Sequence, residues 1–304
     1  MLIIKNKCTW VDIGLPNEAD AEFLKKEFSF PPNALEGLME QSPRQSVSKY
    51  NGLLYMVIHF PFWEAEKQIT RPLELDIILT KNAIVTVRYE NHIEPIEQIL
   101  ANCEPSEIGE KYLNTTPYAF LEKLLDTYFE YCSREIRHIS DNLDIVEKEI
   151  LENNGSHELL VNKLAVLKRD ILSFRRIASL NKNILESLKI SGETFYGKES
   201  SSCFDELANA SFRMNNTIEG FSDIISSLEN TFNTLVSAQV NKLTKTYTYI
   251  SLIIWPALLV FAFYQTNGLN MPFIERQYSW IYILSLAAAL SLIVFAILKK
   301  KKVI

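Results

Sequence analysis

Carboxylates are the side chains of this sequence whose type and spacing could do chemistry. Residues 205–229 carry five of them against one basic residue, Arg213. Carboxylate oxygens are the ligands that Mg²⁺ accepts in proteins, so these acids could hold a divalent cation. Solvated surface acids are an equally good interpretation of each one. The five are Asp205, Glu206, Glu219, Asp223 and Glu229.

The cysteines and histidines form no reactive centre by their spacing. No CxxC pair and no zinc-type spacing occurs, and we find no phosphate-binding loop or nucleophile elbow. We therefore expect no enzyme, reduced thiols and no organic cofactor. The net charge of −6 also argues against nucleic acid as a partner. The residues are Cys8, Cys103, Cys132, Cys203, His59, His92, His138 and His157.

Two apolar spans near the C-terminus follow these acids and predict where in the cell the acids act. They cover residues 246–264 and 278–298 and are separated by the polar segment 265–277. A helix needs about 20 apolar residues to cross a bilayer, so each span can form a transmembrane helix. Pro256 lies within the first span, and proline is tolerated in membrane helices that have packed neighbours. The lipid bilayer is thus an expected partner.

The charges that flank the spans predict their orientation. Lys242 and Lys245 precede the first span, and four lysines at 299–302 follow the second. The connecting segment has Arg276 against Glu275, the acid of an outer loop. Because Lys and Arg stay preferentially in the cytoplasm, we expect a multi-pass protein of the cell membrane with both termini cytoplasmic.

The first 110 residues predict a cytoplasmic α/β domain. Runs rich in β-branched and aromatic residues at 1–4, 53–60, 73–80 and 83–89 favour strands, with Lys81-Asn82 as a tight turn. Residues 17–28 and 31–39 favour helices. Residues 111–200 then predict a long antiparallel helix pair, in which Pro117 opens the first helix and residues 159–188 form the second.

A heptad pattern runs from this body into the first span. One row is Leu207, Met214, Phe221, Leu228 and Leu235, and a companion row is Ile218, Ile225, Phe232 and Gln239. A helix of roughly 60 residues would be about 90 Å long, and a heptad helix needs partner helices. These can come from the same chain or from other copies. Several copies bundled around an axis would line it with their first spans, which suits a pore.

The full length resembles the CorA family of divalent metal ion transporters. Residues 241–248 resemble the family's N-x-x-M-x-x-L-T junction, Pro256 falls at its membrane proline, and Tyr264 at the Tyr of its Y-G-M-N signature. The resemblance implies a funnel-shaped homo-oligomer, a pentamer, with an α+β cytoplasmic domain, long helices and a two-helix transmembrane hairpin. The expected divisions are 1–110, 111–200, 201–245 (stalk), 246–264, 265–277, 278–298 and 299–304 (basic tail).

The outer signature departs from the family's pattern. Gly-Met-Asn is expected after Tyr264, but the chain has Gln265, Thr266 and Asn267, so only the Asn matches. A register shifted by three would use residues 268–270 instead. The resemblance implies a ring of amide and backbone carbonyls that holds a hydrated Mg²⁺ through its waters. The three side chains remain polar and uncharged, but the ion selectivity stays open.

The same register places a pore-facing stripe along the first membrane helix and the end of the stalk. Family members have aliphatic residues or Met at the constrictions, whereas here Tyr247 and Trp255 would form two aromatic rings that can gate by dewetting. Alternatively, both are interface or packing residues. The stripe comprises Asn241, Thr244, Tyr247, Ser251, Trp255, Leu258 and Ala262.

The family is regulated by cytoplasmic metal bound between subunits. Glu206 falls at its stalk-side carboxylate, and Glu64 and Glu66 are candidates for the partner from a neighbouring subunit, with Asp223 as a further candidate. The resemblance thus implies a divalent cation, Mg²⁺ foremost, as both substrate and regulator. Two alternatives stay open: a changed selectivity for Zn²⁺, Co²⁺, Ni²⁺ or Mn²⁺, with or without proton coupling, and a membrane-anchored oligomeric scaffold without transport.

Overall fold

The computed structural model describes residues 1–64, 67, 69–90, 93–103, 114–152, 156–266, 272 and 278–300. The chain divides into two compact units, residues 1–229 and 230–304.

The first unit contains a mixed six-stranded sheet of order β1-β2-β6-β5-β4-β3. The β2–β6 pair is parallel, with Val11 opposite Val85, and the other neighbours are antiparallel. The turn at Lys81-Asn82 is the predicted one, because the Thr80 amide donates to the Ala83 carbonyl at 2.9 Å. The strands are β1 (Leu2–Ile4), β2 (Thr9–Gly14), β3 (Ser46–Tyr50), β4 (Leu53–Glu64), β5 (Ile69–Leu79) and β6 (Ala83–Arg88).

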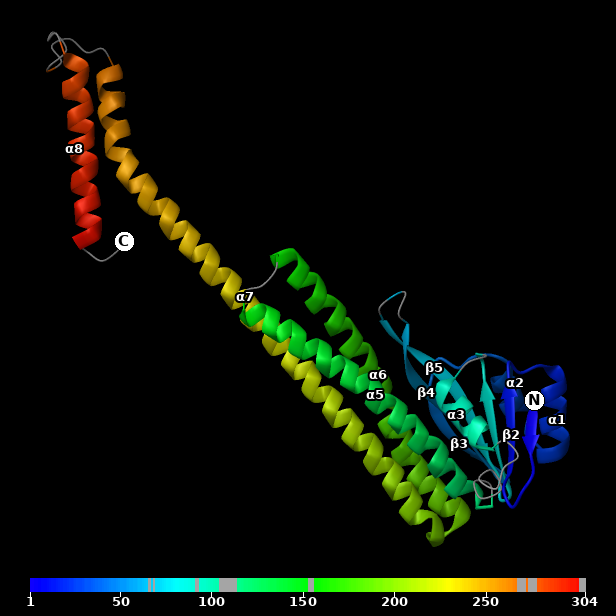
Figure 1. Cartoon of the computed structure of the whole chain (residues 1–304). Coiled ribbons are helices and arrows are strands. Elements are labelled where there is room, and N and C mark those ends of the chain that lie inside the picture. Colours follow the sequence, from blue (N-terminus) through cyan, green and yellow to red (C-terminus); the bar gives the residue numbers. More distant parts are fainter. Residues whose placement is uncertain are drawn as a thin grey trace. The chain divides into compact units, whose positions relative to one another are not determined.

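Helices cover both faces of this sheet. Helices α1 (Glu18–Phe28) and α2 (Pro32–Met39) pack on one face, and α5 (Pro117–Leu151) and α6 (His157–Tyr196) contact the other (Figure 1). Strands buried on both sides read as continuous apolar runs, which is why the central strands β4, β5 and β6 are visible in the sequence. The predicted helices and four predicted strands are confirmed. Strands β2 and β3 and helix α3 (Glu94–Cys103) were not predicted.

Local sequence signals set the ends of α1. The Asn17 side chain accepts a hydrogen bond from the backbone N–H of Asp20 at 3.1 Å. The Asp20 carboxylate accepts one from the backbone N–H of Asn17 at 3.2 Å. This is a reciprocal capping box. The helix ends where Ser29 adopts a left-handed backbone, with φ of +49°.

The long helices form a bundle in the first unit. After the predicted pair α5 and α6, the short helix η1 (Lys198–Ser200) leads into α7 (Ser201–Gln265). Ion pairs tie α6 to α7, with Lys189 Nζ 2.5 Å from Asp205 and Lys168 Nζ 2.6 Å from Glu229. The heptad rows are largely buried as far as Phe232, although Phe221 is half-exposed. Leu235 and Gln239 are exposed, so the later part of the pattern has no cover within the chain.

The second unit contains the end of α7 and helix α8 (Ser279–Lys300). Both helices are long and apolar enough to cross a membrane, and almost none of their apolar stretches is buried. Pro256 lies inside α7 without ending it. Among the described residues from Asn233 onward, only Val260 and Ala287 are buried.

Candidate functional site

The predicted pore stripe lies on α7 and is uncovered in the single chain. All seven of its residues are exposed, among them Tyr247 and Trp255, which are 68% and 63% exposed. A large contiguous apolar surface left exposed by a chain marks a protein or membrane interaction site. The stripe is Asn241, Thr244, Tyr247, Ser251, Trp255, Leu258 and Ala262.

The polar groups near the stripe mostly bond to their own helix. Ser251 Oγ donates to the Tyr247 carbonyl at 2.9 Å, and the neighbouring Thr248 Oγ1 donates to the Thr244 carbonyl at 2.8 Å. Such back-bonding satisfies a hydroxyl without a second helix. Asn241 differs, because its exposed amide has no hydrogen bond to any residue that the structure describes. If several copies assembled around an axis, a ring of Asn241 side chains would have amide groups free to contact an ion or its water.

The predicted mouth begins where α7 ends. Gln265 is the last helical residue, and Thr266 closes the helix because its amide and its hydroxyl both donate to the Phe263 carbonyl, at 3.3 and 2.7 Å. Both side chains are exposed. Asn267, the shifted alternative at 268–270 and Glu275 lie outside the described residues.

Glu206 lies beside two acids of α5 that we did not predict. Burial raises the pKa of Glu122, and the charges of Glu206 and Asp126 raise it further, although a hydrogen bond with the Cys203 thiol opposes the shift. Burial also raises the pKa of Asp126, followed by the charges of Glu206 and Glu130. Repelling carboxylates are a place where a bound cation would lower the electrostatic energy.

This acidic group is not a complete ligand set in one chain. No cluster of three or more His, Cys, Asp or Glu side chains that could hold a metal occurs among the described residues. The sequence did contain a signal for the α5 acids, because Glu122, Asp126 and Glu130 recur every four residues and so share one helix face. What it could not show was that this face meets Glu206.

The structure gives Glu64 other partners within its own chain. Its carboxylate lies 2.9 Å from Lys67 Nζ and 3.4 Å from Arg71 Nε. Arg71 also donates to both carboxylate oxygens of Glu90, at 2.6 and 2.9 Å. A metal at Glu64 would have to displace this network, which weakens that prediction. Glu66 lies outside the described residues, and Asp223 is exposed on α7.

Comparison with known proteins gives a consistent family match. Residues 5–300 match the family described as CorA-like Mg²⁺ transporter protein. The chain is 24% identical over 298 residues to the cobalt/magnesium transport protein CorA of Thermotoga maritima, covering 97% of this chain and 83% of that one. It is 23% identical over 317 residues to the magnesium transport protein CorA of Helicobacter pylori, covering 99% and 92%.

A solved structure shows the same fold. The CorA magnesium transporter from Methanocaldococcus jannaschii superimposes with a TM-score of 0.81, covering 98% of this chain and 92% of that one at 16% identity. The sheet, the long helices and the two C-terminal apolar helices therefore correspond over nearly the whole length.

Proposed function

The chain belongs to the family of CorA-like Mg²⁺ transporters, membrane transporters of divalent cations and not enzymes, and from this premise we propose how its own residues carry and control the ion. Mg²⁺ is the substrate that the named relatives support best. The ion moves down its electrochemical gradient through a pore that several copies form together.

The assembly is a homopentamer around the exposed stripe of α7. The observation that carries this proposal is the change of burial along one continuous helix. Heptad positions such as Ile218 and Ile225 are buried, whereas every residue of the predicted stripe is exposed. An uncovered heptad helix that enters a membrane span needs partners, and further copies of the same chain supply them symmetrically.

The mouth of the pore selects the ion through its hydration shell. Mg²⁺ gives up water reluctantly, so neutral oxygens that bind the hydrated ion suit it better than a tight cage. Gln265, the last residue of α7, and Thr266 and Asn267 after it would supply amide and hydroxyl oxygens on the outer side of a cell membrane whose cytoplasmic side holds both termini. Asn241 provides a second amide ring at the inner end of the stripe.

Control of the pore uses the acids at the base of α7. A cation that bridges Glu206 and carboxylates of an adjacent subunit would hold the stalks together and close the pore when the ion is plentiful. The position of Glu122 and Asp126 supports this role: burial is the main cause of their raised pKa values, and the charge of the nearby Glu206 raises them further. The α5 acids can join Glu206 on its own chain in holding such a cation, whereas Lys67 and Arg71 already neutralise Glu64.

Ion flux into proteoliposomes tests the proposal. We expect the purified, oligomeric protein to take up Mg²⁺. Uptake of Co²⁺, Ni²⁺, Zn²⁺ and Mn²⁺ is measured in parallel, and each cation is tested with and without a pH gradient. Asn267→Ala should lower Mg²⁺ flux at least about tenfold, because the neutral oxygen ring is lost. The matched control is Asn230→Ala, an exposed amide of α7 outside the stripe.

Each alternative outcome has a distinct meaning. A monomer in mild detergent would refute the pore. Unchanged flux in an assembled Asn267→Ala variant would remove Asn267 from the mouth. Uptake of Zn²⁺ in preference to Mg²⁺ would show that the altered signature has changed the substrate, and no uptake of any cation by a verified oligomer would favour a scaffold.

A further inference from the structure

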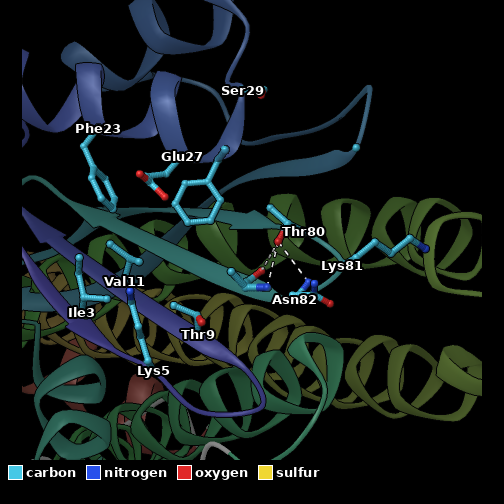
Figure 2. Close-up of a pocket in the computed structure, with 13 residues that line it drawn as sticks. Ile3, Lys5, Thr9, Val11, Phe23, Glu27, Ser29, Thr80, Lys81 and Asn82 are labelled. Carbon is cyan, nitrogen blue, oxygen red and sulfur yellow. Dashed lines mark hydrogen bonds between the residues drawn. The ribbon is translucent and has the colours of Figure 1, made fainter.

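A cavity in the first unit shares no residue with the proposed pore stripe or with the acidic group around Glu206. Its volume is about 690 Å³, within the range of small-molecule sites. Its lining residues come from strands β1 and β2 with the loop between them, from the C-terminal half of α1, from the turn between β3 and β4, and from the turn between β5 and β6. Figure 2 shows Phe23 and Glu27 of α1 facing Ile3, Lys5 and Val11 of the strand region, with Thr80–Asn82 closing a third side.

One wall of the cavity is aromatic. Phe23 and Phe28 meet edge to face, with ring centroids 6.1 Å apart and an interplanar angle of 73°. Both rings border the core on the α1–α2 face of the sheet, yet both stay partly exposed toward the cavity. Val11 and Ala83 are buried at its base. An apolar group placed here would gain contact with two ring surfaces without moving the core.

Opposite charges border the cavity, one from α1 and one from the strand side. Glu27 is the only carboxylate among the lining residues, all of which the structure describes, and it lies in the last turn of α1. The C-terminal end of a helix adds partial negative charge there. Lys5 lies on the strand side (Figure 2). Neither Lys5 nor Glu27 has an ion pair or hydrogen bond with any described residue.

The remaining lining cation is already engaged. The Lys81 ammonium donates to the Phe195 carbonyl and lies 4.5 Å from the Phe195 ring centroid. The Tyr196 hydroxyl donates to the Thr80 carbonyl at 2.7 Å, so the whole turn is fastened to the end of α6. The turn is therefore a fixed wall, and Lys5 is left as the lining cation that can receive an anionic group.

We propose that this cavity binds a small zwitterion with an apolar body, the chemistry of a free hydrophobic α-amino acid. Its carboxylate pairs with Lys5, its ammonium group pairs with Glu27 at the end of α1, and its side chain lies against Phe23 and Phe28. The site is independent of ion transport, since none of these residues belongs to the stripe or to the acidic group.

Calorimetric titration of the full-length protein in detergent micelles tests this site with three probes. L-phenylalanine carries both charges, phenethylamine lacks the carboxylate, and 3-phenylpropanoate lacks the ammonium group. We expect L-phenylalanine to bind about two- to fivefold more tightly than either relative, since a charge contact with an exposed Lys or Glu is weakened by solvent. In Lys5→Gln, L-phenylalanine should bind no more tightly than phenethylamine. In Glu27→Gln, it should bind no more tightly than 3-phenylpropanoate.

Matched variants separate the site from general charge effects. Lys7→Gln and Glu22→Gln change exposed residues of the same two segments that do not line the cavity, and they should bind all probes as the native protein does. Lys5→Arg keeps the positive charge and should retain most of the affinity. The proposal is overturned if no probe gives saturable heat up to millimolar concentration, if phenethylamine matches L-phenylalanine, or if Lys5→Gln and Glu27→Gln bind like their controls.

Discussion

Asp76 is a fully buried carboxyl group in the middle of β5. Its Oδ2 atom accepts hydrogen bonds from the hydroxyls of Tyr55 and Tyr89, at 2.7 and 2.9 Å, while Oδ1 has no hydrogen-bond partner among the residues that the structure describes. Burial raises the pKa of Asp76 to about 8, and the nearby Glu74 charge raises it while the two tyrosines lower it. The group is therefore neutral in the native protein at pH values where an unfolded chain would ionise it.

This shift predicts how stability depends on pH. Between about pH 4 and pH 8 the native state holds a proton that the unfolded carboxyl group has lost, so the free energy of unfolding falls as the pH rises. The slope from one such group is at most about 1.4 kcal/mol per pH unit. In Asp76→Asn the side chain stays neutral at every pH, so this contribution to the pH dependence is lost. When both proteins are unfolded by heat between pH 5 and pH 9, the stability of the variant relative to the unmodified protein should increase with pH.

The control for this prediction is an exposed acid. Asp144→Asn changes a solvent-facing carboxylate of α5, so its stability difference from the native protein should stay nearly constant over the same pH range. If Asp76→Asn and Asp144→Asn gave parallel curves, Asp76 would not be protonated in the native state.

At the scale of elements, α6 and α7 approach closely at Gly192. A Cβ atom at this position would lie 2.4 Å from Cε2 of Phe204, a buried ring of α7. Gly192→Ala should therefore force the two helices apart or turn the ring, at a cost of about 1–3 kcal/mol. We expect a lower melting temperature for this variant by circular dichroism.

Gly220 on α7 provides the comparison. A Cβ atom there meets nothing within 4 Å, and alanine favours a helix over glycine by up to about 1 kcal/mol. Gly220→Ala should be neutral or stabilising. Equal melting temperatures for both alanine variants would show that the contact between Gly192 and Phe204 does not limit the packing of α6 on α7.

The elements that the sequence predicts are those whose stability is encoded locally. Central strands such as β4 and the capped helix α1 carry apolar runs and turn residues of their own. Strand β2 is short and includes the buried Asp12, whose carboxylate accepts from Thr86 and pairs with Arg88 of β6. Strand β3 is a polar edge strand. Both depend on a partner strand distant in sequence, so local patterns could not identify them.

The candidate site divides in the same way. The helical period places the stripe from Asn241 to Ala262 on one face without tertiary information. To predict the neighbours of Glu206, one must know how α5 packs against α7. To predict the partners of Glu64, one must know how β4 pairs with β5. Spacing in a helix is a property of the sequence, whereas contact between helices depends on how their apolar faces meet.

At the scale of the whole molecule, the exposed indole of Trp255 would form a constriction if five copies assembled around one axis. Trp255 on each α7 would then face the same axis, and a ring of indoles would exclude water from a narrow path and so resist a hydrated ion. In the single chain Trp255 is 63% exposed, although it also borders an apolar groove that Leu259 of α7 and Leu286 of α8 help to line. The aromatic ring should therefore limit conduction rather than stabilise the subunit.

Replacing Trp255 with alanine should raise Mg²⁺ flux several-fold in proteoliposomes, while size-exclusion chromatography with light scattering shows an unchanged oligomer. Trp280→Ala is the control, because it removes an equally large exposed indole, 65% exposed, from α8, which does not carry the stripe. If Trp255→Ala lowered flux or broke the assembly while Trp280→Ala did neither, Trp255 would be a packing residue between copies. An increase confined to Trp255→Ala would locate the barrier to the ion on the axis of the assembly.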